Sequence, residues 1–212
     1  MHIVRSGASR RRSGLAAGLI AGSLALAGSA SAQEISDGVV KIGIMNDRSG
    51  VYADTGGEGS VVAARLAVED FGGTVLGAPI EIVAADHQNK ADIGSNVARQ
   101  WYDEDKVDAI MDLPTSSVAL AVQSLSREKK KITIVSGGGS AEISGSQCSP
   151  YGFQWAYDTR ALSRGTAGAL VRGGDDTWFF LTADYAFGDS LQSQATEVIE
   201  ANGGKVLGAV RH

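Results

Sequence analysis

Two short stretches of the sequence place hydroxyl groups directly behind apolar runs, where they could bind an anion. Thr115, Ser116 and Ser117 follow an apolar run that ends at Pro114, and the segment 136–142 reads Ser-Gly-Gly-Gly-Ser-Ala-Glu behind another. Hydroxyls and the free amides of a helix N-terminus both favour negative charge. The stretches therefore predict a site for an anionic group such as a carboxylate. An ordinary helix cap that binds nothing is the alternative.

The elements that would position these stretches alternate regularly between strand and helix patterns. Strands are predicted over 39–45, 80–85, 107–111, 132–135, 153–157, 177–182 and 205–210, and helices over 60–71, 91–105, 115–131, 159–171 and 190–201. This alternation predicts an α/β protein with a parallel, doubly wound sheet. Ligands of such sheets bind beyond the carboxyl ends of the strands, near the point where strand order reverses. The two hydroxyl stretches would follow adjacent strands, so we expect them, with two helix N-termini, to converge.

Apolar spacing within these elements predicts which residues form the core. The predicted stripes are Val61, Ala64, Leu66 and Val68 in one helix and Ile93, Val97, Ala98 and Trp101 in the next. Phe153, Trp155 and Tyr157 stand at alternate positions and predict a strand with one apolar face. Trp178 is also expected in the core, whereas His87 lies in a polar turn and is expected at the surface.

The first 32 residues have the pattern of an export signal. Arginines at positions 5 and 10–12 precede an apolar run over 15–27, and Ala30-Ser31-Ala32 is a small-residue cleavage site. We expect cleavage after Ala32 and a periplasmic location. An uncleaved membrane anchor is the alternative, although the run is short for a span. Gln33, and not a cysteine, follows the site, which argues against a lipid anchor, and the choice between the general secretory and twin-arginine routes stays open.

Charge and cysteine content exclude several classes of protein. Removing residues 1–32 takes away four arginines and no acidic residue, which changes the formal net charge from −5 to −9. No basic patch remains to suggest that the protein binds nucleic acid. Cys148 is the only cysteine, so no disulfide can form within the chain. It is expected to be a buried thiol or to pair with a partner outside these residues.

The sequence contains no catalytic or cofactor motif. It lacks a nucleophile elbow, a phosphate-binding Walker loop, a Cys-x-x-Cys pair and the dinucleotide-binding glycine pattern behind a strand. We therefore predict that the protein is not an enzyme and uses no cofactor or metal ion. An exported enzyme on the same fold, with His87 as its candidate base, is the minor alternative.

Three segments, in this order, resemble a known family. They are Val-Lys-Ile-Gly-Ile followed by Asp47-Arg48-Ser49-Gly50-Val51-Tyr52, then Val-Asp-Ala-Ile with Thr-Ser-Ser-Val-Ala-Leu-Ala-Val, and finally Ala183-Asp-Tyr-Ala-Phe-Gly188. The chain after Ala32 resembles the exported substrate-binding proteins of branched-chain amino acid type ABC transporters. These are type I periplasmic binding proteins similar to the leucine-binding protein.

The resemblance implies two α/β lobes joined by a hinge, with a ligand clamped between them. The first lobe would span 33–156, and the second would begin at residue 157 and be incomplete at residue 212, because full-length members are much longer. The protein would be a monomer that captures a small carboxylate-bearing solute, an amino acid or an aromatic acid, and delivers it to an inner-membrane ABC permease. A ligand-sensing receptor domain of the same fold that signals to a partner is the alternative.

The resemblance also assigns ligand-binding roles. The positions that match are Tyr52, Thr115, Ser116, Ser117, Gly138, Gly139, Ser140, Tyr157 and Tyr185. The hydroxyls after Pro114 would hold the carboxylate, the loop 138–140 would add backbone groups and a hydroxyl, and Tyr52 and Tyr185 would pack against the rest of the ligand. Tyr157, at the expected hinge, would line the cleft or pack with its aromatic neighbours. The family's acidic residue for a ligand ammonium has no counterpart within these 212 residues, so ligand identity stays open.

Overall fold

The larger of two sheets in the computed structural model, which describes residue 35 and residues 37–212, has six strands. The predicted export signal over 1–32 lies outside these described residues. The strands, in the order β2-β3-β1-β4-β5-β6, are β1 (Val40–Asn46), β2 (Thr74–Val75), β3 (Ala78–Asp86), β4 (Ala109–Asp112), β5 (Ile132–Val135) and β6 (Gly152–Gln154). Neighbouring strands pair in parallel, except that β2, a two-residue strand the sequence did not predict, pairs antiparallel with β3.

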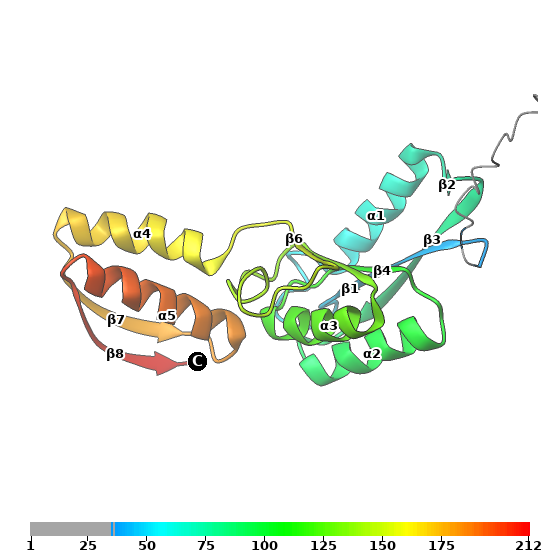
Figure 1. Cartoon of the computed structure of the whole chain (residues 1–212). Coiled ribbons are helices and arrows are strands. Elements are labelled where there is room, and N and C mark those ends of the chain that lie inside the picture. Colours follow the sequence, from blue (N-terminus) through cyan, green and yellow to red (C-terminus); the bar gives the residue numbers. More distant parts are fainter. Residues whose placement is uncertain (1–34, 36) are drawn as a thin grey trace, which may run out of the picture. The chain divides into compact units, whose positions relative to one another are not determined.

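Helices cover this sheet on both faces. They are α1 (Gly57–Phe71), α2 (Ala91–Asp103) and α3 (Ser116–Lys129). α1 lies on one face, and α2 and α3 lie side by side on the other (Figure 1). Strand order reverses at β1, because the chain passes from β1 to β3 on one side and then to β4 on the other. This is the doubly wound α/β fold that the alternation of patterns predicts.

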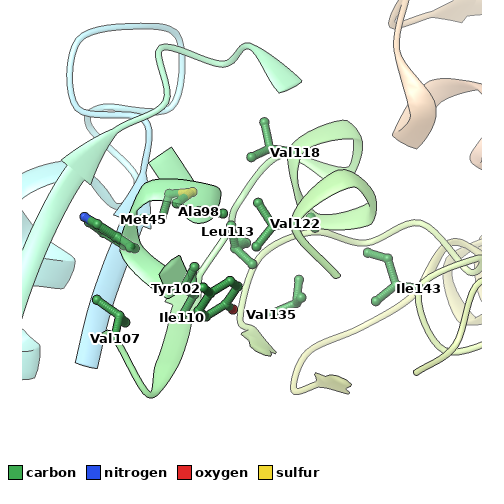
Figure 2. Packing of buried hydrophobic residues seen from close by; sticks show 12 residues of the cluster. Met45, Ala98, Tyr102, Val107, Ile110, Leu113, Val118, Val122, Val135 and Ile143 are labelled. Atoms are coloured by element: carbon green, nitrogen blue, oxygen red, sulfur yellow. The ribbon is translucent and has the colours of Figure 1, made fainter. Parts of the chain in front are cut away.

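The main hydrophobic core lies between the sheet and the helices α2 and α3. Met45, Ile110 and Val135 of the strands pack with Val118 and Val122 of α3 (Figure 2). All five side chains are fully buried. The strand residues belong to β1, β4 and β5, so this core holds β1 together with the two strands, β4 and β5, whose carboxyl ends carry the predicted hydroxyl stretches.

Trp101 of α2 is buried, as predicted, and a glycine makes room for it. The Trp101 side chain is 7% exposed. A Cβ atom on Gly43, in the middle of β1, would overlap the six-membered ring of Trp101. Gly94 of α2 has the same function toward Val118, whose Cγ1 lies 2.5 Å from the position of an added Cβ. These two glycines allow α2 to pack closely against β1 and α3.

The apolar stripe of α1 differs from the predicted one at a single residue. Val61 is buried and Ala64 and Val68 are half-buried, but Leu66 is 54% exposed, so its predicted core position was wrong. Leu66 follows Ala64 by two residues, which is about 200° around a helix. It therefore faces away from β1 and β3, the strands that α1 contacts.

The strand predicted over 153–157 is shorter than expected and has no buried apolar face. β6 ends at Gln154, and Phe153, Trp155 and Tyr157 are 52%, 80% and 53% exposed. The prediction was wrong because alternation gives the period of a strand and not whether a layer covers it. β6 is the last strand of its sheet and pairs only with β5.

The second sheet consists of two parallel strands, β7 (Thr177–Thr182) and β8 (Lys205–Arg211). Helices α4 (Thr159–Gly173) and α5 (Ala186–Ala201) pack against each other beside these strands (Figure 1). Ala167, Val171, Ala195 and Ile199 of the helices form a buried cluster with Trp178, Phe180, Val198 and Val206 packed against it. Trp178 is thus in contact with a core, as predicted, although it is only half-buried.

The other face of β7 and β8 is apolar and exposed within the described chain. Phe179, Leu181, Leu207 and Val210 are 63%, 70%, 61% and 50% exposed. Burying each such side chain would contribute roughly 1.5–3 kcal/mol. This face is the opposite one to the face that contacts α4 and α5. The division of the chain into lobes of 33–156 and 157–212 stays a prediction.

His87 is buried, so the prediction of a surface histidine was wrong. The residue follows β3 directly and has no exposed surface. Its Nδ1 accepts a hydrogen bond from the Asn89 amide at 3.0 Å, and Nε2 has no partner among the described residues. Burial lowers the pKa of His87 below its usual value, although the carboxylates of Asp47, Asp86 and Asp112 oppose the shift. The polar turn misled the prediction because its other residues, and not His87, face the solvent.

Cys148 is exposed, so a buried thiol is excluded. Pairing with a cysteine outside this chain stays a prediction. No helix in the described part of the chain is both long enough and apolar enough to cross a membrane.

We expect Gly43→Ala to destabilise the fold by about 1–3 kcal/mol, because the added methyl group must displace the Trp101 ring or the strand. Thermal melting followed by circular dichroism measures the change. Gly59→Ala is the control, because nothing lies within 4 Å of its added Cβ and the residue lies inside α1. Better helix propensity should stabilise that variant by up to about 1 kcal/mol. Equal melting of Gly43→Ala and wild type would contradict the close packing.

We expect stability to fall on acidification because His87 is buried in its neutral form. The unfolded chain binds a proton at His87 near its ordinary pKa of about 6.5, whereas the folded chain binds it only at lower pH. The contribution of neutral His87 to the free energy of unfolding is therefore fully present above about pH 6.5 and decreases as the pH falls below that value. His87→Gln should flatten the dependence of Tm on pH between about pH 7 and pH 5. His212→Gln, at an exposed histidine, should leave the slope unchanged, and a wild-type slope in His87→Gln would refute this account.

Candidate functional site

The carboxyl ends of β1 and β5 are both hydrogen-bonded to one turn, which Asp112 and Leu113 form at the carboxyl end of β4. The Leu113 amide donates to the Met45 carbonyl at the end of β1, at 2.9 Å. From the end of β5, the Ser136 amide donates to the Asp112 carbonyl at 2.8 Å. The Gly138 amide donates to the Leu113 carbonyl at 3.1 Å. The two hydroxyl stretches therefore follow adjacent strands, as the sequence predicts, and begin beside a shared turn.

Asp112 is the charged residue of this turn, and sequence reasoning missed it. One carboxylate oxygen accepts from the Asn46 side-chain amide at 2.9 Å, and the other accepts from the Ser136 hydroxyl at 2.6 Å. Asp112 and Leu113 have φ values of +85° and +54°. Residues other than glycine rarely adopt these left-handed conformations, which often occur at functional sites. The signal in the sequence was a charged residue at the end of a buried strand, two positions before a proline.

The three hydroxyls after Pro114 do not cap the helix that they begin. Thr115 is the N-cap residue of α3, yet its hydroxyl donates to the Asn89 side-chain oxygen at 2.5 Å, and no side chain caps α3 within the described chain. The Ser117 hydroxyl accepts from the Ala186 amide at 3.4 Å. The ordinary-cap alternative is therefore wrong in that no side chain of the described residues caps this turn, and the binding of an anion here stays a prediction. The first amides of α3 remain without a side-chain partner, which favours an anion there.

Ser116 and Ser140 join the two hydroxyl stretches to each other. The Ser140 amide donates to the Ser116 hydroxyl at 3.1 Å, and the Glu142 amide donates to the Ser140 hydroxyl at 3.3 Å. Both serines are buried. Each hydroxyl accepts one bond and keeps a proton for which the described residues offer no acceptor. The two serines hold the loops in place with one donor left on each.

Backbone carbonyls of the second hydroxyl stretch accept hydrogen bonds from other residues of the protein. The Gly138 carbonyl accepts from the Gln154 side chain at 3.0 Å, and the Gly139 carbonyl accepts from the Thr159 amide at 2.8 Å. Residues 141–147 form successive turns and no helix. The expected second helix N-terminus was therefore wrong. The turns close through their own backbone bonds, such as the Gly145 amide to the Glu142 carbonyl at 3.2 Å.

Tyr52 is held in place by Asp47, a buried residue directly after β1. The Asp47 carboxylate accepts from the Gly50 amide at 2.8 Å and from the Tyr52 amide at 2.9 Å. A Cβ on Gly50 would lie 2.6 Å from both carboxylate oxygens, so the turn requires glycine. This local bonding fixes the loop that carries Tyr52 without using any core residue.

Tyr185 contacts Tyr52 from the second sheet's first loop. The two hydroxyls are hydrogen-bonded to each other, and Tyr185 stacks on Phe187 with 6.2 Å between ring centroids. Burial raises the pKa of Tyr185 above its usual value, and the hydrogen bond to Tyr52 adds to this shift. Tyr185 thus stays neutral at physiological pH. Residues 133 positions apart in the chain meet at the same place.

Two cavities share Tyr52 as a wall. The first, of about 560 Å³, is lined by Val51, Tyr52, Asn89, Thr115, Ser117, Ala183, Asp184, Tyr185 and His212. The second, of about 440 Å³, is lined by Tyr52, Thr55, Gly56, Ser60, Asp112, Pro114, Ser136, Gly137 and Tyr157. We call them the hydroxyl cavity and the Asp112 cavity. Five of the nine predicted ligand-binding residues line one or both cavities. The other four, Ser116 and residues 138–140, line neither cavity and hold the two hydroxyl stretches in place.

Tyr157 lines the Asp112 cavity and does not pack with its exposed neighbour Trp155. Its ring lies 2.8 Å from the position of a Cβ added to Gly139, so a side chain there would displace it. Of the two possibilities left open by the sequence, the structure places Tyr157 at the cavity. Gly139 therefore contributes by its lack of a side chain, which allows this close approach.

Three aspartates lie at the carboxyl ends of β1, β3 and β4 and set the electrostatics of the site: Asp47 follows β1, Asp86 ends β3 and Asp112 ends β4. Asp47 and Asp112 have the contacts given above. Burial alone would raise the pKa of Asp86, but hydrogen bonds from the Ser49 hydroxyl and the amides of Arg48 and Gln88 outweigh it, so the pKa of this carboxyl is lowered. Among the described residues, no three side chains of the kinds that bind metals lie together.

Sequence reasoning found the hydroxyls but missed the residues that orient them. Asn89 bonds directly to the predicted residue Thr115, and Asp47 bonds to the loop that carries Tyr52. Polar residues at the first or second position after a strand were the available signal, because parallel strands bring their carboxyl ends to one edge.

The chain matches the family model described as periplasmic binding protein over residues 39–212. It is similar to a periplasmic binding protein of Burkholderia mallei, with 51% identity and a TM-score of 0.80 over 82% of this chain and 47% of that one. It is also similar to a branched chain amino acid ABC transporter periplasmic ligand-binding protein of Burkholderia xenovorans, with 39% identity and a TM-score of 0.68 over 82% and 46% of the two chains.

A third similar structure is a solute binding protein of an ABC transporter from Rhodopseudomonas palustris, in complex with 3,4-dihydroxybenzoic acid. It has 26% identity and a TM-score of 0.73, over 82% of this chain and 47% of that one. The present chain thus spans about half the length of these structures. No curated protein sequence matches it significantly. Because the family model covers nearly all of the described residues, the chain belongs to the periplasmic binding protein family.

Proposed function

We propose that the protein is the periplasmic substrate-binding component of an ABC transporter. It captures a small solute that carries a carboxylate, an amino acid or an aromatic acid, and presents it to an inner-membrane permease. The first lobe spans 33–156 and the second begins at residue 157, and the protein works as a monomer after removal of residues 1–32. The similarity to an ABC transporter ligand-binding protein of Burkholderia xenovorans and to an ABC transporter solute binding protein of Rhodopseudomonas palustris supports this role.

The hydroxyl cavity carries the proposal. The hydroxyls of Thr115 and Ser117 lie on its wall, and the helix that begins with these residues has no side-chain cap. A carboxylate there can accept hydrogen bonds from a hydroxyl and from helix amides, in the field of the helix dipole. Bonds to a charged group contribute about 1.5–3 kcal/mol each. Ser116 and Ser140 support this wall and can each add one O–H donor.

The volume and the aromatic wall of the cavities suit a small solute with an apolar part. Tyr52 and Tyr185 supply rings and hydroxyls, and about 560 Å³ lies within the range typical of small-molecule sites. The rings can pack against an aliphatic side chain or an aromatic acid. Because Tyr185 comes from the loop after β7, a solute bound here contacts both sheets' loops, and this contact favours a closed arrangement of the two lobes.

We expect the full-length protein to bind members of a panel of amino acids and aromatic acids saturably, as measured by isothermal titration calorimetry. For the solute that binds, Ser117→Ala should raise Kd roughly tenfold to 100-fold, because one hydrogen bond to the carboxylate is lost. Ser124→Ala, at an exposed serine of the same helix, should leave Kd unchanged.

The absence of saturable binding to any carboxylate of the panel would refute the proposed function. Unchanged affinity in Ser117→Ala, together with intact binding in the wild type, would instead place the carboxylate elsewhere.

We expect two substitutions of Tyr185 to differ in effect. Tyr185→Phe removes the hydrogen bond to Tyr52 but keeps the ring, so it should weaken binding by less than about tenfold. Tyr185→Ala also removes the ring and should weaken binding further and speed solute dissociation. Stopped-flow fluorescence measures both rates. Tyr151→Phe, which lines neither of the two cavities, is the control. Equal effects of the two Tyr185 variants would rule out a packing role for the ring.

A further inference from the structure

The Asp112 cavity contains a carboxylate that no cation among the described residues neutralises. The ion pairs of the described residues involve other acidic side chains, namely Glu58, Asp103, Asp108, Asp184 and Asp189. Asp112 is half-buried, and within the described part of the chain its carboxylate has two partners, both neutral, the Asn46 amide and the Ser136 hydroxyl. A carboxylate that is partly removed from water without a cationic partner is destabilised unless donors reach it.

A second hydrogen-bond acceptor, the side-chain oxygen of Asn46, lies on a residue bonded to Asp112. Asn46 is fully buried, and its side-chain NH₂ group donates to the Gly57 carbonyl at 2.7 Å and to Asp112 at 2.9 Å. Both of these partners are acceptors, so the orientation of the Asn46 amide is fixed. Its oxygen is left without a donor among the described residues. Buried acceptors of this kind are rare and call for an explanation.

The remaining walls of the cavity suit a group that donates hydrogen bonds. Ser60 and Ser136 provide hydroxyls, and Tyr52 and Tyr157 provide aromatic rings. Aromatic rings attract cations and can also stack on a ring of the solute. The cavity thus combines one negative charge, hydroxyls and aromatic rings, and its residues include no lysine or arginine.

We propose that Asp112 is the specificity-determining acceptor for a hydrogen-bond donor on the solute, either the ammonium of an amino acid or a hydroxyl of a hydroxylated aromatic acid. The inference rests on the proposed function, because it assigns a second contact to the same solute. The carboxylate of the solute binds in the hydroxyl cavity, and its donor group lies against Asp112. Solutes that carry a carboxylate alone are disfavoured, because they leave Asp112 unpartnered and place a second negative charge near it.

Matched pairs of solutes test this assignment in the full-length protein. Phenylalanine is compared with 3-phenylpropionate, leucine with 4-methylpentanoate, and 3,4-dihydroxybenzoate with benzoate, each by isothermal titration calorimetry. The first two pairs differ by an ammonium and the third by hydroxyls, so the pairs separate the two sources of the donor. In the pair that the wild type binds, the donor-bearing member should bind at least about tenfold more tightly.

Two variants of Asp112 should remove this preference. Asp112→Asn keeps the size of the side chain and tolerates positive φ, and Asp112→Gly fits the left-handed backbone while removing the carboxylate entirely. In both, the two members of the pair should bind within about threefold of each other. Asp54→Asn, which removes a nearby exposed charge outside both cavities, should keep the preference.

Equal weakening of both members of a pair, or an unchanged preference in the Asp112 variants, would overturn the assignment while leaving the proposed function intact. If the wild type binds the donor-lacking member as tightly as its partner, the assignment fails as well. If no member of any pair binds, the proposed function fails, and the role of Asp112 with it.

Discussion

The site depends on one strained turn, Asp112 and Leu113 at the end of β4, to which the ends of two neighbouring strands, β1 and β5, are bonded. Two consecutive residues other than glycine adopt left-handed conformations there, and each such residue stores on the order of 1–3 kcal/mol of strain. The strain is balanced by backbone bonds to Met45, Ser136 and Gly138. Because these bonds come from both neighbouring strands, the turn cannot relax without separating β4 from β1 and β5. The start of α3 and the Asp112 carboxylate are therefore fixed before any solute arrives.

The hydroxyls that stand out in the sequence divide into two physical roles. Ser116 and Ser140 are buried, and a buried hydroxyl must find a partner, which each finds in the backbone of the chain. Ser117 is half-buried and lies on a cavity wall, where a solute can reach it. Thr115 lines the same cavity, but it is only 1% exposed and its hydroxyl donates to Asn89. Spacing alone cannot separate these roles, because neighbouring residues at a helix start point in directions about 100° apart. Only the packing of the second loop against α3 decides which hydroxyl is buried and bonded to the backbone.

The sequence was sufficient for the parts of the fold that repeat. Alternation of strand and helix patterns gives the doubly wound sheet, and helical spacing gives Trp101 and Val61 in the core. The sequence was insufficient where the burial of a single residue depends on which neighbours it contacts in the fold, because no periodic pattern in the sequence records those contacts. His87 looked exposed because its turn is polar, and Leu66 looked buried because the pattern was apolar.

The same limit applies to the candidate site. The hydroxyls and tyrosines were found because they cluster in the sequence or match a family pattern. Asn46 and Asp112 were missed because they are isolated polar residues that end strands, and their importance comes from strands that the chain brings together only after 60 or more residues. Parallel sheets concentrate such residues at one edge, so their contribution is a property of topology and not of local sequence.

Opposite electrostatic preferences on the two sides of Tyr52 explain how one site can select between solutes of similar shape. The uncapped start of α3 favours negative charge, whereas the Asp112 carboxylate, three residues earlier in the chain, favours a donor or a positive charge. Like charges repel by about 4 kcal/mol at a separation of about 4 Å and an effective dielectric constant near 20, and the repulsion falls in inverse proportion to the distance. A solute with a carboxylate alone thus gains on one side of Tyr52 and loses part of that gain on the other. A solute with both groups gains on both sides, so selection comes from the fixed placement of charge around the cavities and needs no difference in the volume of the solute.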